Sequence, residues 1–189
     1  MYDTQKQLFN ELNQKQAELT KRFIDYWLEY SFFDSWQFWC TLAMLVVPLI
    51  LLYFKMDRSK ALLLGFFGFN VHVWFTYIDT FGVKLNFWNY PYQVIPIMGV
   101  NFGLDVSFIP VLFMFLYQWI INNDKNFYLY FTLLSLTLAF GLKPLLVALD
   151  LFQLTNGANY FHLLLGYLTV MLMSKWTTNL FLSFKKTSG

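Results

Sequence analysis

The feature that most constrains this chain is a set of long segments that contain no Asp, Glu, Lys or Arg. Five such segments cover residues 35–54, 61–78, 106–123, 126–142 and 151–174. A helix that crosses a membrane needs about 20 mainly apolar residues, within a range of roughly 17–25. All five segments reach that range. The pattern therefore predicts a bundle of membrane helices.

The composition excludes several other classes of protein. Of the 189 residues, 58% are hydrophobic, 22% are aromatic and only 13% are charged, whereas a soluble domain carries about 25% charged residues. A soluble enzyme with a polar surface is thereby excluded. The net charge of +2 is too small to indicate nucleic-acid binding, and a single cysteine, Cys40, cannot form an internal disulfide or a cysteine-based zinc site.

The first 34 residues differ from the rest, because they hold ten of the 24 charged residues. Within them, apolar side chains recur at helical spacing: Leu8, Leu12, Leu19, Phe23, Tyr26 and Tyr30. This spacing predicts an amphipathic N-terminal helix in residues 1–34, which either packs at the membrane surface or dimerises as a coiled coil. No apolar core region or cleavage site of a signal peptide is visible in this segment.

A sixth uncharged window, residues 85–104, is not expected to be a membrane helix. It contains four residues that disfavour helices: Pro91, Pro96, Gly99 and Gly103. Proline in a helix interior removes a hydrogen bond and clashes with the preceding turn. The window is therefore expected to be an ordered loop that folds over the bundle, with Trp88, Tyr90 and Tyr92 at headgroup depth. Re-entry of this window into the bilayer is the alternative.

The predicted fold class is all-α: an integral membrane bundle of five transmembrane helices, residues 35–189, preceded by the amphipathic helix. The spans are expected at about 36–54, 61–81, 106–123, 127–149 and 160–174. Seven Lys or Arg residues then fall on one side of the membrane and three on the other. By the positive-inside rule, this multi-pass protein has its N-terminus outside and its C-terminus in the cytoplasm.

Ionisable residues within or beside the spans are expected to gather at one membrane face. Lys143 lies 18 residues after Lys125, which corresponds to about 27 Å of helix and nearly the whole hydrocarbon thickness. The same reasoning puts five groups at the outer face: Asp79, Asp105, Lys143, Asp150 and His162. Alternatively, Asp105 and Asp150 simply mark the points where helices leave the bilayer, and His162 is an aromatic residue at the membrane interface. Lys143 is expected either to extend to the headgroups or to pair with Asp79 or Asp105.

Asp79 gives the strongest signal for a site. His72, Thr76 and Asp79 follow one another at steps of four and three residues, so they form one polar stripe on an apolar helix. Such a stripe has to face the bundle interior or a water-filled cavity. It predicts either a structural hydrogen-bond network or a site that handles protons or binds a headgroup.

Recognisable motifs for metals, cofactors and catalysis are missing from the sequence. There is no HxxxH or HExxH spacing, no P-loop, no dinucleotide fingerprint and no nucleophile elbow. We therefore expect no metal and no cofactor, and assign no catalytic residue from the sequence.

Several motifs resemble a known group of proteins. They are Asp79-Thr80-Phe81-Gly82, Trp88-Asn89-Tyr90-Pro91, Pro96, Asp105, Pro110, Tyr117-Gln118, and Tyr26-Trp27 with Phe33–Trp39. The chain resembles a family of small polytopic integral membrane proteins of unassigned function from spore-forming Gram-positive bacteria, most specifically in the Gly-x5-Trp-x-Tyr-Pro loop. Lys143 departs from that family's pattern, in which an acidic residue is expected before the proline. The resemblance implies a bacterial plasma membrane and supplies no activity.

The leading functional hypothesis is a binding protein without catalytic activity. Its outer-face pocket is expected to contain His72, Asp79, Trp88, Tyr90, Asp105 and Lys143. The ligand would be a membrane lipid headgroup or a partner protein, which could be a second copy of the chain, and nucleic acid is not expected. The alternative is an intramembrane enzyme that acts on a lipid or polyprenoid, with Asp79 as acid or base and Lys143 as charge stabiliser. A small transporter or channel subunit is the third possibility.

Overall fold

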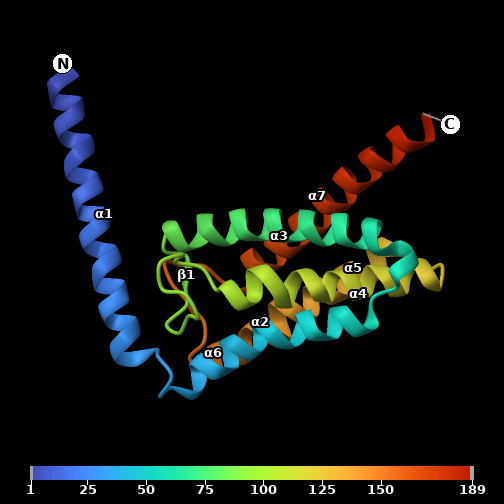
Figure 1. The fold of residues 1–189 in the computed structure, drawn as a ribbon, viewed down its shortest axis with the longest axis horizontal. Coiled ribbons are helices and arrows are strands. Elements are labelled where there is room, and N and C mark those ends of the chain that lie inside the picture. Colours follow the sequence, from blue (N-terminus) through green and yellow to red (C-terminus); the bar gives the residue numbers. More distant parts are fainter. Residues whose placement is uncertain (1, 188–189) are drawn as a thin grey trace.

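The computed structural model describes residues 2–187, and the chain in it is almost entirely helical (Figure 1). The α-helices are α1 (Tyr2–Tyr30), α2 (Trp36–Lys55), α3 (Ala61–Lys84), α4 (Ile109–Asn122), α5 (Phe127–Thr137), α6 (Lys143–Ala148) and α7 (Tyr160–Thr187). A 3-10 turn, η1 (Arg58–Lys60), precedes α3, and two π-helical turns, η2 (Leu104–Phe108) and η3 (Leu138–Leu142), lie within longer helices. The two-residue strands β1 (Trp88–Asn89) and β2 (Gln153–Leu154) form an antiparallel pair.

Four helical segments of the described chain are long and apolar enough to cross a membrane. They are Trp36–Lys55, Arg58–Lys84, Leu104–Asn122 and Phe127–Ala148. These segments coincide with the first four predicted spans, so the chain has the character of a multi-pass membrane protein. Helix α7 is not among the four, because polar residues such as His162 and Lys175 interrupt its apolar sequence.

The helices begin where the sequence provides side-chain caps. The Ser35 hydroxyl accepts a hydrogen bond from the Phe38 N–H at the start of α2, and the Asn126 side chain accepts one from the Leu129 N–H at the start of α5. Both bonds satisfy N–H groups that have no partner inside the helix. The caps follow directly from local sequence.

Each π-helical turn ends two residues before a proline. In η2 the Ile109 N–H donates to the Leu104 carbonyl, and in η3 the Lys143 N–H donates to the Leu138 carbonyl, five residues back in both cases. The next residue in each case is a proline, Pro110 or Pro144, which has no N–H to donate. The wider turn lets the helix continue through the proline, and it changes which side chains face the interior. Both spans 104–122 and 127–148 are therefore continuous helices with one π-helical turn each.

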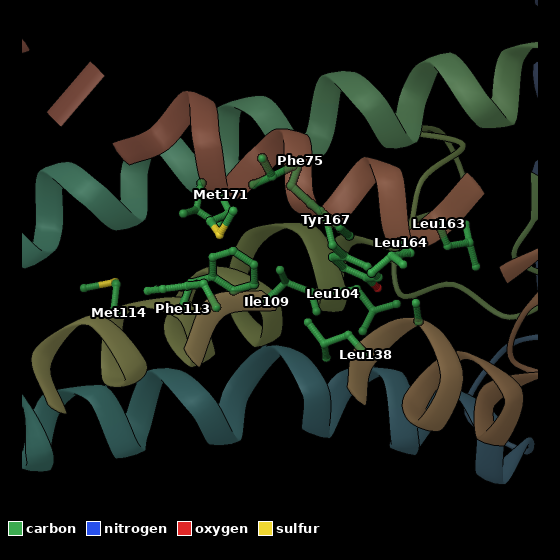
Figure 2. Packing of buried hydrophobic residues seen from close by; sticks show 14 of the residues in the cluster. Phe75, Leu104, Ile109, Phe113, Met114, Leu138, Leu163, Leu164, Tyr167 and Met171 are labelled. Carbon is green, nitrogen blue, oxygen red and sulfur yellow. The ribbon is translucent and has the colours of Figure 1, made fainter. Parts of the chain in front are cut away.

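Helix α3 packs against α7 and against α4, whose span is the most deeply buried of the four. Figure 2 shows Phe75, Ile109, Phe113, Tyr167 and Met171 filling the space between these helices. Close approach depends on small residues at two contacts. A Cβ at position 68 would lie 2.2 Å from the Met114 sulfur, and one at position 103 would lie 2.5 Å from the Thr41 carbonyl of α2.

Residues 85–101 form an irregular loop at the end of the bundle where α3 ends, and the loop is tied to β2 through β1. Helix α1 ends beside this loop and diverges from the bundle toward its own N-terminus (Figure 1). In the described structure, the hydrogen bonds between α1 and the loop lie at its C-terminal end: the Trp27 indole N–H donates to the Gln93 carbonyl at 2.7 Å, and the Ser31 hydroxyl, just after the helix, accepts from the Gln93 N–H at 3.2 Å. The apolar residues identified on α1 are exposed in this structure.

Candidate functional site

Asp79, near the C-terminal end of α3, is hydrogen-bonded to the loop. The Trp88 indole N–H donates to its Oδ1 at 2.9 Å, and the Tyr90 hydroxyl donates to the same oxygen at 2.7 Å. Asp79 is 4% exposed, and its Oδ2 is buried without a hydrogen-bond partner among the described residues. A carboxylate that accepts two side-chain hydrogen bonds fixes both donors, so Asp79 holds the loop against α3.

Gly82 allows the loop to approach α3 this closely. A Cβ at this position would lie 1.9 Å from the Trp88 ring, far below any permitted contact. The Gly82 carbonyl also accepts a hydrogen bond from the Phe87 N–H at 2.8 Å, which turns the chain back over the helix. The spacing Gly82-x5-Trp88 therefore has a steric cause: the indole lies where a side chain would otherwise be.

Lys143, the first residue of α6, extends toward Tyr90 of the loop. Its Nζ donates to the Tyr90 hydroxyl at 3.2 Å and lies 3.7 Å from the centroid of the Phe152 ring. The side chain is 2% exposed, so the expectation that it extends to the headgroups is wrong. The other expectation, a direct ion pair, is also wrong: among the described residues, no carboxylate lies within 4.0 Å of Lys143. Its partners are a phenol and an aromatic face.

Asp105, in η2, is the most isolated group of the site. It is 1% exposed, and neither carboxylate oxygen has a hydrogen-bond partner in the described structure. The charges of Asp79 and Lys143 both act on it. A buried carboxyl without hydrogen bonds is energetically unfavourable, and an ionisable group at such a position is a functional-site hypothesis.

His72 contacts the backbone of Asp105. Its Nδ1 lies 2.8 Å from the Asp105 carbonyl oxygen, and because a carbonyl only accepts, Nδ1 carries the hydrogen. This carbonyl lacks a helical donor, since the Ile109 N–H bonds to Leu104 and Pro110 has none. Thr76 completes the stripe with its hydroxyl 3.4 Å from the same nitrogen. The stripe His72–Thr76–Asp79 thus faces η2 and the loop.

Tyr167, on α7, is a member of the site that sequence reasoning did not select, because no polar pattern marks it on its helix. Its ring stacks on Phe75, with centroids 5.7 Å apart, and its hydroxyl is buried without a partner among the described residues. A cavity of about 20 Å³ between α3 and α7 is lined by Asp79, Trp88, Lys143 and Tyr167, among others. This volume accommodates about one water-sized molecule. Figure 2 shows Tyr167 directed into the bundle.

These residues together form what we call the buried polar cluster: Asp79, Trp88, Tyr90, Asp105, Lys143 and Tyr167. Two carboxyl groups and one ammonium come from three different helical segments, and Tyr90 of the loop links Asp79 to Lys143 by hydrogen bonds, whereas the Asp105 carboxyl has none in the described structure. Burial, together with the charge of Asp79, holds the pKa of the Tyr90 phenol well above its usual value. Tyr90 therefore stays protonated at neutral pH and remains a donor to Asp79.

The other two groups expected at this face lie apart from the cluster. His162 is exposed, lines the edge of the small cavity, and accepts a hydrogen bond at Nδ1 from the Asn159 N–H. Asp150 is exposed at the end of α6 with a positive φ of 57°. Of the three aromatic loop residues, Trp88 and Tyr90 are buried, whereas Tyr92 is half-buried.

An open vestibule lies on the other side of the loop, between it and α1. It consists of two cavities, of about 340 and 400 Å³. Both are lined by Phe23, Asn86, Asn89, Tyr90, Gln93 and Pro96. Tyr26, Trp27 and Gln153 line the smaller cavity, and Lys84 lines the larger one. Tyr90 joins the two regions, because it lines the vestibule while its hydroxyl bonds to Asp79.

The described residues contain no group of three or more His, Cys, Asp or Glu side chains that could hold a metal ion. Protein-family models, curated proteins and solved structures gave no match to this chain. What the site can do is therefore argued from its own geometry. It offers an open amphiphilic vestibule backed by a buried set of acid, phenol and ammonium groups.

Proposed function

We propose that this chain is a membrane protein of five spans that binds a lipid headgroup in the vestibule at the outer face. In this proposal α7 is the fifth span, α1 is an amphipathic helix at the membrane surface, and the family is the one from spore-forming bacteria that the loop motif resembles. Four helices with the length and composition of membrane spans support it. The exposed leucines and aromatics of α1 also support it, since an interfacial helix buries such a face among the lipids.

The observation that carries the proposal is the position and lining of the vestibule. It lies at the end of α3, where an apolar span ends and the headgroup region is expected to begin. Its wall combines aromatic rings with side-chain amides, a combination that suits ligands that are apolar at one end and polar at the other. Its volume is in the range of small-molecule sites.

The buried polar cluster has a supporting role in this function. Asp79 and Lys143 both bond to Tyr90, so they fix the loop that forms one wall of the vestibule. Because this wall is already rigid, less conformational entropy is lost when a ligand binds. The cluster therefore positions the site without having to contact the ligand.

An intramembrane enzyme that acts on a lipid or polyprenoid is the second candidate. The observation that favours it is the chain of contacts from Asp79 through the Tyr90 hydroxyl to Lys143, next to a cavity of about 20 Å³. A carboxyl, a phenol and an ammonium in a site with little water could transfer a proton to or from a substrate.

The test is mass spectrometry of the lipids that stay bound after purification in mild detergent. We expect one class to be enriched over the bulk membrane extract, and Gln153→Trp to reduce that enrichment, because exposed Gln153 lines the smaller cavity. Gln14→Trp is the matched control, since Gln14 is exposed on α1 and lines no part of the vestibule. A bulk-like lipid profile in the wild-type protein would refute the binding function. Chemically altered lipid that disappears with Asp79→Asn would favour the enzyme.

A further inference from the structure

The lining of the vestibule is rich in side-chain amides, also includes threonine and tyrosine hydroxyls, and contains no acidic side chain. Asn86, Asn89, Gln93 and Gln153 contribute to the lining, and no Asp or Glu does. An amide side chain both donates and accepts hydrogen bonds, as a hydroxyl does. This wall therefore matches a ligand with hydroxyl groups better than one with a quaternary ammonium, which has no donor.

One of these amides has an unused acceptor. Gln93 donates from Nε2 to the Tyr90 carbonyl at 3.1 Å, while its Oε1 is buried and has no partner among the described residues. Buried carbonyl oxygens in proteins are nearly always hydrogen-bonded. Because Gln93 lines both cavities, a rotation of its side chain would bring this oxygen to a donor on a bound ligand.

A single charged residue lines the vestibule in the described structure, and it is a cation. Lys84 lies at the C-terminal end of α3, is exposed, and forms no ion pair with any described residue. It lines the larger cavity next to the shared amides Asn86, Asn89 and Gln93. A ligand with one negative charge close to its hydroxyl groups would match this arrangement.

Aromatic side chains of α1 line one side of the vestibule. Phe23 and Tyr26 of α1 are 53% and 42% exposed, and Trp27 lies beside them and bonds to the loop at Gln93. Flat aromatic faces pack well against C–H groups, which the carbon skeleton of a polyol presents beside its hydroxyls.

We propose that the vestibule recognises a headgroup that combines hydroxyl groups with a single negative charge, as a glycerol joined through a phosphodiester does. This proposal names the ligand class of the site and rests on the proposed function. Lys84 pairs with the phosphate, the amides bond to the hydroxyls, and the α1 aromatics cover the carbon skeleton. Free glycerol phosphate presents the same kinds of group, hydroxyls and a phosphate, although its monoester phosphate carries close to two charges at neutral pH, so the experiment has to separate the two sources.

The experiment measures single lipids bound to the full chain by native mass spectrometry, in phosphatidylcholine nanodiscs with one guest lipid at a time. The guests are phosphatidylglycerol, which has hydroxyls and charge, phosphatidic acid, which has charge without the glycerol, and glucosyl-diacylglycerol, which has hydroxyls without charge. We expect phosphatidylglycerol to bind about tenfold more tightly than either of the others, because phosphatidic acid lacks the headgroup hydroxyls that bond to the amides and the glucosyl lipid lacks the charge that pairs with Lys84. Soluble glycerol 3-phosphate is added as a competitor.

Two variants test the role of the charge. Lys84→Gln is expected to lower phosphatidylglycerol binding to the level of the glucosyl lipid, whereas Lys125→Gln, at an exposed lysine in the loop between α4 and α5, should leave it unchanged. Equal losses in both variants would overturn the pairing with Lys84. Displacement by millimolar glycerol 3-phosphate would support the chemistry and identify the soluble molecule as its source.

The remaining outcomes separate this inference from the function on which it rests. Phosphatidic acid or the glucosyl lipid binding as tightly as phosphatidylglycerol would overturn the headgroup class. If all guests bind alike and Gln153→Trp still weakens them, the vestibule is a lipid site and only the class is wrong. If no guest binds above phosphatidylcholine and Gln153→Trp has no effect, both proposals fail.

Discussion

At the scale of single residues, the site depends on an absent side chain as much as on those present. Gly82 leaves room for the Trp88 indole, whose N–H bonds to Asp79, and the Tyr90 hydroxyl bonds to the same oxygen. Lys143 then bonds to Tyr90. Each of these contacts needs the loop within reach of α3, so one added methyl group affects all of them.

Gly82→Ala is expected to destabilise the protein and expose Trp88. The new Cβ would overlap the indole, so Trp88 has to move, and a buried carboxyl that loses a donor costs about 1–3 kcal/mol.

Gly65→Ala is the matched control, because Gly65 is also in α3 and nothing lies within 4 Å of its added Cβ. That variant should be neutral or more stable by up to about 1 kcal/mol, owing to the helix propensity of alanine. Thermal unfolding and tryptophan fluorescence in detergent report both effects, and equal behaviour of the two variants would contradict the steric account.

At the scale of elements, the two prolines determine how helices present polar groups. Pro110 and Pro144 each follow a π-helical turn, and these turns place Asp105 and Lys143 in one buried cluster. The proline positions are visible in the sequence and predict a missing backbone hydrogen bond. Whether the helix kinks, ends or widens by one residue depends on what packs around it, and here His72 donates to the carbonyl that has no helical donor.

A double-mutant cycle tests the link between His72 and Pro110. We expect His72→Phe to destabilise the protein by about 1–3 kcal/mol, because the buried Asp105 carbonyl loses its donor. In the Pro110→Ala background the cost should be smaller, because the introduced alanine supplies a backbone N–H within the helix. The free energies of unfolding of the four proteins give the coupling, and strictly additive effects would show that the two residues are independent.

At the scale of the whole molecule, the question is which ends of the helices share a side of the membrane. The loop and the β1–β2 pair lie at one end of the bundle (Figure 1), and residues of this loop line the vestibule. The proposed topology puts that end outside. Helix α7 determines whether the C-terminus lies on the opposite side, and its mixed composition makes direct measurement necessary.

Cysteine labelling can test this topology, since Cys40 is the only cysteine in the sequence. In a Cys40→Ser background, a membrane-impermeant thiol reagent applied to intact cells should label Gln153→Cys. It should label Asn123→Cys and Ser183→Cys only after the cells are permeabilised. Labelling of Ser183→Cys together with Gln153→Cys would show that α7 does not cross, and the reverse pattern at Gln153 and Asn123 would invert the orientation.

The helical architecture and the general position of the polar groups follow from local features of the sequence. Long uncharged windows predicted spans that the structure has as helices, and the prolines of 85–104 predicted a loop, because both depend on local hydropathy and backbone chemistry. Asp79 could be selected because an acidic residue in an apolar helix needs a partner.

The partners of these groups follow only from the three-dimensional packing of the helices. Lys143 bonds to a phenol 53 residues away in sequence and lies over Phe152, and Tyr167 enters the cluster from α7. The vestibule exists because α1 is anchored at one end by Trp27 and diverges beyond it. None of this follows from residue spacing, because contacts between separate helices depend on how the helices rotate and cross, and that is set by packing summed over the whole bundle.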